Sequence, residues 1–309
     1  MSTTARMTGP GGPLRLRRLR TAGQAAPARG SPAIDGRGGP VIQSPLFDGI
    51  EDRIMSLENK ENVGSFYDIV WTEYVPEYRE SEDHWSRFYD AAEVRGKSVL
   101  DAGCGTGIFS IIFARQGSGK VTGIDISPGS LSTGRAMKKS FGLENVEFRQ
   151  EDMLHLPFKD AEFDIVWAWG TVHHTTDPLG AVTELIRVLK PGGSLFLAIY
   201  KKTRLTFIHE VIRKTLIRTP RSWWTGLSKF FAVLLAPVVF LFKKREKARK
   251  GEKLEELILD WYFVPIRHHY TPEEIRAFLE KRGFTIEKFL PASGRFDSTS
   301  NFIYKARKP

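Results

Sequence analysis

The sequence predicts an α/β fold with a doubly wound, mostly parallel β-sheet. Between residues 98 and 200, five short apolar runs alternate with segments whose apolar residues recur at helical spacing. A glycine-rich turn joins the first apolar run to the first helical segment. Strands that alternate with helices at this spacing form βαβ units, and such units place their strands in parallel.

The elements of this alternation follow one another from residue 97 to residue 200. The expected strands are Ser98–Asp101, Lys120–Asp125, Val146–Arg149, Asp164–Trp169 and Ser194–Tyr200, and the expected helices are Ile108–Arg115, Ser130–Phe141 and Leu179–Leu189. Residues 97–200 therefore form the predicted core, in which strands and helices alternate.

The C-terminal part, residues 266–309, is expected to complete the core with one helix and two strands. Thr271-Pro272-Glu273-Glu274 is a capping box with proline at the first helical position, and Gly283 ends the helix. Phe284–Leu290 and Asn301–Lys305 then read as two strands. They are close enough in sequence to pair in antiparallel fashion.

Two segments precede the core. Residues 1–50 are rich in Arg, Gly and Pro without a periodic apolar pattern, so we expect a disordered tail. Its composition also fits an organelle transit peptide or an extended start before Met55, and these interpretations stay open. Residues 51–96 predict an N-terminal helical lid, with an aromatic helix from Ser65 to about Trp85 and a second helix through Trp85, Phe88 and Tyr89.

The charge is distributed unevenly along the chain. The net charge is +10, but residues 1–47 contribute +6 and residues 201–253 contribute +12, so the remainder sums to −8. The bulk of the chain is therefore acidic, and the positive charge belongs to a tail and one later segment. Cys104 is the one cysteine, which excludes an intramolecular disulfide and a multi-cysteine zinc site and suits the cytoplasm.

The strongest chemical signal lies at the first strand-to-helix turn. Its sequence is Asp101-Ala102-Gly103-Cys104-Gly105-Thr106-Gly107, where glycine permits a tight turn and a close approach to a ligand. This spacing is not the dinucleotide fingerprint, because Ile108 stands where that motif needs its third glycine. The second strand ends in Asp125, whose carboxylate can accept hydrogen bonds from both hydroxyls of a ribose. Together these features predict a nucleoside ligand.

Four motifs in order resemble the class I S-adenosylmethionine-dependent methyltransferases, particularly the broad group that includes the ubiquinone and menaquinone biosynthesis methyltransferases. These motifs are Val99–Gly107, Gly123–Ser127, Gln150–Met153 and Arg187–Gly193. The resemblance covers about residues 60–200 and 266–309. It implies a Rossmann-like sheet of seven strands with an antiparallel C-terminal hairpin, and S-adenosyl-L-methionine as the cofactor.

The same resemblance implies roles for individual residues. The loop from Asp101 to Gly107 would hold the methionine part of the cofactor, Asp152 would face the adenine amino group, and Met153 would pack on the adenine ring. The expected cofactor-binding residues are Asp101, Ala102, Gly103, Cys104, Gly105, Gly107, Asp125, Ile126, Glu151, Asp152, Met153, Trp169 and Tyr67. Cys104 is expected to pack in the loop and not to act as a nucleophile.

Candidate acid–base groups follow the fourth and fifth strands. His173 and His174 come just after the fourth strand and Tyr200 ends the fifth, and the carboxyl ends of such strands face the ligand crevice. These three residues are the catalytic candidates, because a group that titrates near neutrality helps to remove a proton from a phenolic acceptor. Cofactor contact, hydrogen-bonded structure or a wall of the pocket are their alternative roles. His268 and His269 form a second pair, and one of them could complete the pocket or the pair could belong to the entry of the last helix. Without acids at helical ligand spacing to either pair, we expect no metal.

Residues 201–265 are inserted between the fifth strand and the last helix. They begin with an amphipathic helix that has Leu205, Ile208, Val211, Ile212 and Leu216 on one face and Arg204, Arg213, Lys214 and Arg218 on the other. Trp223-Trp224, an apolar run over 230–242 and a basic run over 243–250 follow. Thirteen apolar residues are too few to span a bilayer, which needs about 20. Residues 204–250 fit an anionic membrane surface or a lipid-acceptor lid, and also a buried lid helix or a dimer contact.

The sequence thus predicts a methyltransferase for a small, hydrophobic acceptor, such as a quinone precursor or a lipid, at oxygen or carbon. An RNA methyltransferase that uses residues 201–253 for phosphate contact is one alternative, and a cofactor-binding protein without catalysis is another. The turn Ala168-Trp169-Gly170-Thr171 differs from that of exocyclic-amine methyltransferases of nucleic acid, and no RNA-binding module is recognisable. The expected location is the cytoplasm, with the option of membrane association.

Overall fold

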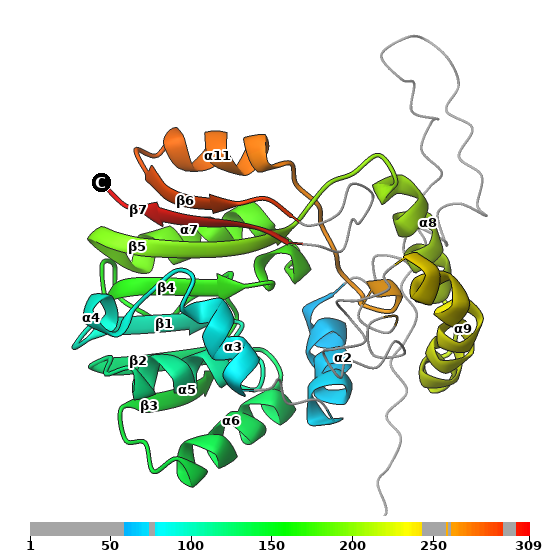
Figure 1. The fold of residues 1–309 in the computed structure, drawn as a ribbon, viewed down its shortest axis with the longest axis horizontal. Helices are drawn as coiled ribbons and strands as arrows, with labels where there is room; N and C mark the ends of the chain where they lie inside the picture. The colour runs from blue at the N-terminus through cyan, green and yellow to red at the C-terminus, as the bar shows by residue number, and fades with distance from the viewer. Residues whose placement is uncertain (1–58, 74–77, 243–257, 259–260, 293–300) are drawn as a thin grey trace, which may run out of the picture. The chain divides into compact units, whose positions relative to one another are not determined.

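The computed structural model contains one mixed β-sheet with helices packed against it (Figure 1). Among the described residues the sheet has seven strands in the order β3-β2-β1-β4-β5-β7-β6. The strands are β1 Ser98–Ala102, β2 Lys120–Asp125, β3 Val146–Gln150, β4 Phe163–Trp169, β5 Leu189–Tyr200, β6 Thr285–Leu290 and β7 Asn301–Arg307. The first five strands pair in parallel, whereas β7 pairs antiparallel with both β5 and β6. The predicted sheet and its antiparallel C-terminal hairpin are confirmed.

The structure describes residues 59–73, 78–242, 258, 261–292 and 301–309. The helices are α2 Lys60–Glu73, α3 Tyr78–Trp85, α4 Ala91–Val94, α5 Ile108–Arg115, α6 Pro128–Ser140, η1 Val172–His174 (a 3₁₀ turn), α7 Pro178–Val188, α8 Thr206–Leu216, α9 Arg221–Phe242 and α11 Pro272–Glu280. The expected tail over residues 1–50 and the basic run over 243–250 lie outside the described residues.

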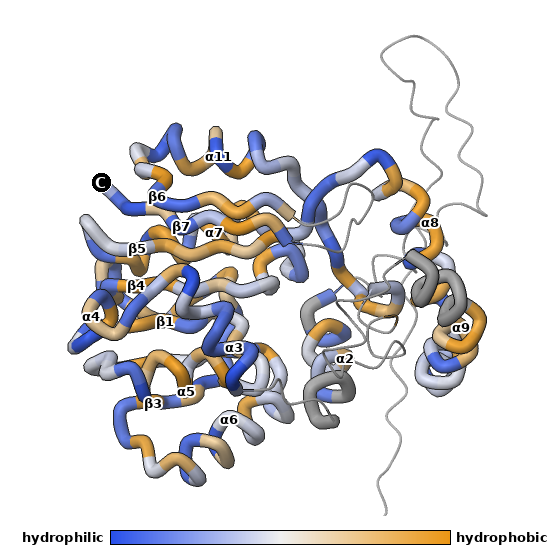
Figure 2. The backbone as a smooth tube through the Cα atoms, in the orientation of Figure 1, coloured by the Kyte–Doolittle hydropathy of each residue, from blue (hydrophilic) through white to orange (hydrophobic). Residues whose placement is uncertain are grey.

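Both faces of the sheet are covered by helices, because alternate residues of each central strand point to opposite sides. On β1, Leu100 belongs to an apolar cluster with residues of α7 and α11. The neighbouring Val99 belongs to a second cluster with residues of α5 and with Trp85 of α3. Figure 2 shows the hydrophobic character of the central strands. The sheet is therefore doubly wound, as the sequence predicts.

Several expected boundaries differ from the structure. The stretch expected as one aromatic helix from Ser65 to about Trp85 contains two helices, because α2 runs from Lys60 to Glu73 and α3 from Tyr78 to Trp85. The second N-terminal helix ends at Trp85, and Phe88 and Tyr89 follow it as buried residues of a turn, because Asp90 caps a new helix there. The fifth strand begins at Leu189 and not at Ser194. Leu189 already pairs with the start of β4, and a β-bulge absorbs the extra residues.

The insertion contributes α8 and α9 to a third apolar cluster. Ile217, which follows α8, and Trp224 of α9 pack with Phe66 of α2 and with Phe263. The described part of the insertion is thus anchored to the N-terminal helix and to the segment that leads into α11. No helix among the described residues combines the length and the apolar character needed to cross a membrane.

Candidate active site

The turn after β1 is shaped by three glycines in the left-handed region. The φ angles of Gly103, Gly105 and Gly107 are 69°, 52° and 79°. A Cβ atom on Gly103 would lie 2.5 Å from the side chain of Thr171, and one on Gly107 would lie 2.4 Å from Phe148. Both distances are shorter than contacts between carbon atoms allow, so glycine is required at these two positions for conformation and for space.

Asp125 ties this loop to the end of β2. Its Oδ2 atom accepts a hydrogen bond from the backbone N–H of Gly105 at 2.8 Å, and its Oδ1 atom accepts one from Ser127 at 2.9 Å. Burial raises the pKa of the Asp125 carboxyl, while the backbone hydrogen bonds oppose that rise. Each carboxylate oxygen keeps a further lone pair, so the group is held in place and can still accept hydrogen bonds from a ligand.

A cavity of about 550 Å³ opens at Ile126, the residue that follows Asp125, and Asp125 is not itself among the residues that line it. It lies among α2, the residues after β2 and the residues after β3. Its lining residues are Glu61, Gly64, Ser65, Asp68, Ile126, Pro128, Gln150, Glu151, Asp152 and His155. Four of these residues carry carboxyl groups, so the cavity favours a ligand with positive charge and with hydrogen-bond donors.

α2 is fastened over the cavity by Asp68. The Oδ1 atom of Asp68 accepts a hydrogen bond from Ser127 Oγ at 2.6 Å and another from the N–H of Gly129 at 2.9 Å. Gly129 lies in the first turn of α6, where free N–H groups favour a negative charge. On the same helix, Tyr67 makes an edge-to-face contact with His174, with ring centroids 5.7 Å apart. α2 therefore borders both the cavity and the histidine pair.

The two histidine pairs come together around Tyr200. The ring centroid of Tyr200 lies 3.9 Å from that of His173, 5.5 Å from that of His174 and 6.0 Å from that of His269. The N–H of His268 donates to the carbonyl of His173 at 2.9 Å. The segment before α11 thus runs alongside η1, and the two pairs belong to one cluster.

His173 and His174 are buried in their uncharged forms. The Nδ1–H of His174 donates to the carbonyl of Ile266 at 2.8 Å, which leaves Nε2 with its lone pair in the neutral ring. Burial lowers the pKa of His174 to about 3, and the nearby Arg267 and Arg213 add to the effect. Burial also places the pKa of His173 well below its usual value. Neither ring nitrogen of His173 has a hydrogen-bond partner among the described residues.

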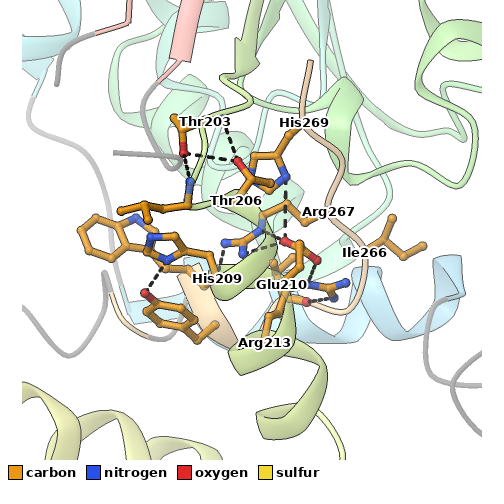
Figure 3. Close-up of polar contacts among 12 residues, drawn as sticks. Thr203, Thr206, His209, Glu210, Arg213, Ile266, Arg267 and His269 are labelled. Atoms are coloured by element: carbon orange, nitrogen blue, oxygen red, sulfur yellow. Dashed lines mark hydrogen bonds and ion pairs between the residues drawn. The ribbon is translucent and has the colours of Figure 1, made fainter. Parts of the chain in front are cut away.

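A buried ion-pair cluster supports the segment that carries Ile266 (Figure 3). Glu210 of α8 accepts hydrogen bonds from Arg213 Nε at 2.9 Å and from Arg267 Nε and Nη2 at 2.9 and 2.8 Å. Arg213 also donates to the carbonyls of Val264 and Pro265. Both guanidinium groups are buried, and their charges hold the pKa of the Glu210 carboxyl below its usual value despite its own burial. α8 is therefore locked to residues 264–267, next to the histidines.

Comparisons with known proteins agree with this sheet order and this glycine loop. A family described as "Methyltransferase domain" matches residues 93–221. The demethylmenaquinone methyltransferase of Lactococcus lactis is 28% identical over 234 residues, which are 70% of this chain and 88% of that protein. The chain is a class I S-adenosylmethionine-dependent methyltransferase.

Two further similarities are more limited. A protein of Oryza sativa named "Probable tocopherol O-methyltransferase, chloroplastic" is 38% identical to the methyltransferase over 109 residues, which are 35% of this chain and 30% of that protein. The solved structure of the [4+2]-cyclase SpnF is 18% identical with a TM-score of 0.51, and the match covers 81% of this chain and 96% of that one. The second similarity concerns the fold alone.

The methyltransferase brings some of the predicted cofactor residues to the cavity. Ile126, Glu151 and Asp152 line it, and the backbone of Gly105 is bonded to Asp125, which precedes Ile126. Glu151 is also paired with Arg149 at 2.7 Å.

Other predicted residues lie in the interior. Asp101 is buried and accepts a hydrogen bond from Ser110 Oγ at 2.6 Å, and Met153 packs against the apolar cluster below α7. Cys104 and Ala102 are buried core residues. Trp169 packs against Phe196, with ring centroids 5.7 Å apart.

Burial also raises the pKa values of two of these interior groups. The pKa of the Asp101 carboxyl rises to about 7, and the pKa of the Cys104 thiol lies well above its usual value. Because its thiolate form is disfavoured, Cys104 is suited to packing and not to nucleophilic attack.

Sequence reasoning missed three polar residues of this methyltransferase that organise the site. Thr171 donates to the carbonyl of Ala102 at 3.0 Å and presses on Gly103, Asp68 fastens α2, and Glu210 holds the ion pairs. No sequence pattern around Thr171 or Asp68 marks either residue as functional. Glu210 could have been singled out from the sequence, because it is the one acidic residue between residues 201 and 242. The described residues contain no group of three or more potential metal ligands.

Proposed function

We propose that this methyltransferase acts on a small, hydrophobic, ring-bearing acceptor of the quinone-precursor class and methylates it at oxygen or carbon. The observation that carries the proposal is the contrast between a cavity and a buried group of rings that both border α2. The cavity is lined by carboxyl groups, and the rings are the uncharged side chains of Tyr67, His173, His174 and Tyr200. The first suits a cationic nucleoside, and the second suits a flat acceptor with few polar groups.

The residues present fit S-adenosylmethionine, which supplies the methyl group and departs as the neutral thioether. Asp125 would accept hydrogen bonds from the ribose hydroxyls, because its two oxygens are fixed by backbone N–H groups and keep free lone pairs. Asp152 and Glu151 would meet the adenosine part, and Gly103 and Gly105 allow the loop to approach the ligand closely. α2 would serve as the lid, since Asp68 closes it over the cavity.

On the acceptor side, the chain supplies orientation and not a strong base. With its pKa lowered to about 3, His174 keeps its Nδ1 proton but does not hold a second proton on Nε2 at neutral pH, and the Nε2 lone pair can accept a hydrogen bond from an acceptor hydroxyl. Holding the attacking atom in line with the methyl group at about 3 Å provides much of the acceleration of such a displacement. His173 and Tyr200 would form the wall against which the acceptor ring packs.

The nature of the relatives supports this acceptor class. Two of them are named for demethylmenaquinone and for tocopherol, which are both ring-bearing hydrophobic molecules, and none of the reported relatives is named for RNA. The burial of aromatic and imidazole rings also fits a hydrophobic acceptor better than it fits a phosphate backbone. The cytoplasm remains our proposal for the location of the reaction.

The test is a methyl-transfer assay with S-adenosylmethionine labelled in its methyl group. The purified full chain is incubated with a demethylated naphthoquinol, with total RNA, or with neither, and the label is measured in the organic, RNA and protein fractions. Label that enters the organic fraction only with the quinol supports the proposal. Label in RNA establishes the RNA alternative, and cofactor binding by calorimetry without label in any fraction indicates a binding protein without catalysis.

A further inference from the structure

The amphipathic helix α8 exposes its apolar face to solvent. Phe207, Ile208, Val211 and Ile212 are all exposed, with Phe207 at 76% of its full accessibility. Of the polar residues of the same helix, Glu210 and Arg213 point into the protein, whereas Lys214 is exposed. A helix at the surface of a soluble domain ordinarily buries its apolar stripe, so the orientation of α8 requires a specific cause.

The ion-pair cluster supplies that cause. Glu210 and Arg213 lie one helical turn apart on the inner face of α8, where they bind Arg267 and the carbonyls of residues 264 and 265 (Figure 3). Turning the apolar face inward would carry these charges into solvent and leave Arg267 buried without its carboxylate. Separating a buried pair in this way is strongly destabilising. The apolar face is therefore held outward by the fold.

The next helix, α9, presents a second apolar face of the same kind. Trp223, Phe230, Val233 and Leu234 are exposed, with Val233 at 77%, whereas Trp224 and Ala232 are buried against the same apolar cluster that anchors α8. Figure 2 shows hydrophobic stretches on both helices. Among the described residues, the exposed large hydrophobic side chains all belong to α8 and α9, apart from Phe141. Such a concentration marks an interaction surface.

The charges beside these faces are positive. Lys202, Arg204, Lys214, Arg218 and Lys229 are exposed, and the single acid between residues 201 and 242 is the ion-paired Glu210. Arg204 precedes α8, Lys214 lies on it and Arg218 follows it, and all three are exposed like the apolar residues of the helix, so cations and apolar groups share the outer surface. The surface therefore complements a partner that is apolar inside and negatively charged at its edge.

We propose that the outer faces of α8 and α9 dock the protein on an anionic lipid bilayer. The exposed apolar side chains would enter the boundary between headgroups and acyl chains, Trp223 would sit at headgroup depth, and the lysines and arginines would meet the lipid phosphates. The N-terminal tail is a poor occupant of this surface, because residues 1–47 carry a charge of +6 and would be repelled. Like charges also oppose a second copy of the chain.

The experiment is co-sedimentation of the full chain with phosphatidylglycerol–phosphatidylcholine vesicles and with phosphatidylcholine vesicles. Phe207→Ser with Val233→Ser removes the most exposed group of each helix and should weaken binding on the order of 100-fold. Lys214→Ala with Arg218→Ala should weaken it roughly 30-fold, since each cation near the surface contributes about 1 kcal/mol. Phe141→Ser, which changes an exposed phenylalanine on another part of the molecule, is the matched control and should bind like the wild type.

All of these residues are exposed, so the variants should keep the thermal midpoint of the wild type, and that measurement accompanies each binding curve. Equal binding to the two vesicle types would overturn the proposal, as would binding that both double variants leave unchanged. If the protein does not bind vesicles but forms a concentration-dependent dimer that Phe207→Ser dissociates, the surface is an interface with a second copy of the chain instead. The methyl-transfer assay uses no vesicles, so its failure is distinguishable from failure of the docking proposal.

Discussion

Replacing Glu210 by glutamine should destabilise the protein by about 3 kcal/mol. The carboxylate accepts three hydrogen bonds of 2.8–2.9 Å from two guanidinium groups, and the side chains of Arg213 and Arg267 are only 2% and 0% exposed. Removing one partner of a buried pair costs roughly 3–5 kcal/mol, because the remaining charge stays buried without compensation. The lower end applies because the Glu210 side chain keeps 20% exposure.

Urea unfolding measures this loss as a lower midpoint at an unchanged slope. Glu280→Gln is the matched control, because Glu280 pairs with Arg276 at 3.4 Å and both side chains are about half exposed. That substitution should cost less than about 0.5 kcal/mol. Arg267→Met added to Glu210→Gln should recover part of the loss, because it removes one uncompensated charge. If Glu210→Gln costs no more than Glu280→Gln, the buried cluster does not fix α8 and the reasoning fails.

Three further predictions concern the cofactor side. Asp125→Ala should weaken S-adenosylmethionine binding by about 1–3 kcal/mol in calorimetry, because ribose hydroxyls and the N–H of Gly105 lose their acceptor; unchanged affinity would contradict the ribose assignment. Gly103→Ala should lower the unfolding midpoint and the cofactor affinity, because the new Cβ would lie 2.5 Å from Thr171 and the φ angle of this residue is 69°. A Gly103→Ala variant with normal stability would show that the loop can shift. The pKa of Asp101 is about 7 in the folded protein, against the ordinary value of 3.8, so between these pH values the native state binds a proton that the unfolded state has lost. The free energy of unfolding should therefore fall by up to about 4 kcal/mol as the pH rises from 4 to 7. Asp101→Asn should flatten this part of the profile of thermal midpoint against pH, and an unaltered profile would exclude Asp101 as its origin.

Local sequence determined the sheet and the glycine loop. β2 and α5 occupy the predicted residues, and the capping box at Thr271 begins α11 as expected. These features are readable because strand period, helix caps and positive φ angles depend on residues that are neighbours in the chain. The position of Asp125 opposite the loop also follows from local pattern, since adjacent parallel strands end at the same edge of the sheet.

Contacts between distant residues decided the acceptor side. The sequence suggests His268 or His269 as a further part of the pocket, but it does not show which residues they meet, because their contacts with Tyr200 and His173 cross about 70 to 100 positions of the chain. The same contacts bury the rings and remove their charge, which turns the expected base into a hydrogen-bond acceptor.

The sequence by itself determined that α8 has an apolar and a basic side, but not which side faces the protein. The orientation depends on Arg267, which lies 57 positions beyond Glu210. Its buried guanidinium needs a carboxylate partner, and α8 can supply one only when Glu210 faces the protein. Periodicity records which residues share a face of a helix. The partner that a face meets is a property of the packed molecule, since the cost of burying a charge depends on what surrounds it.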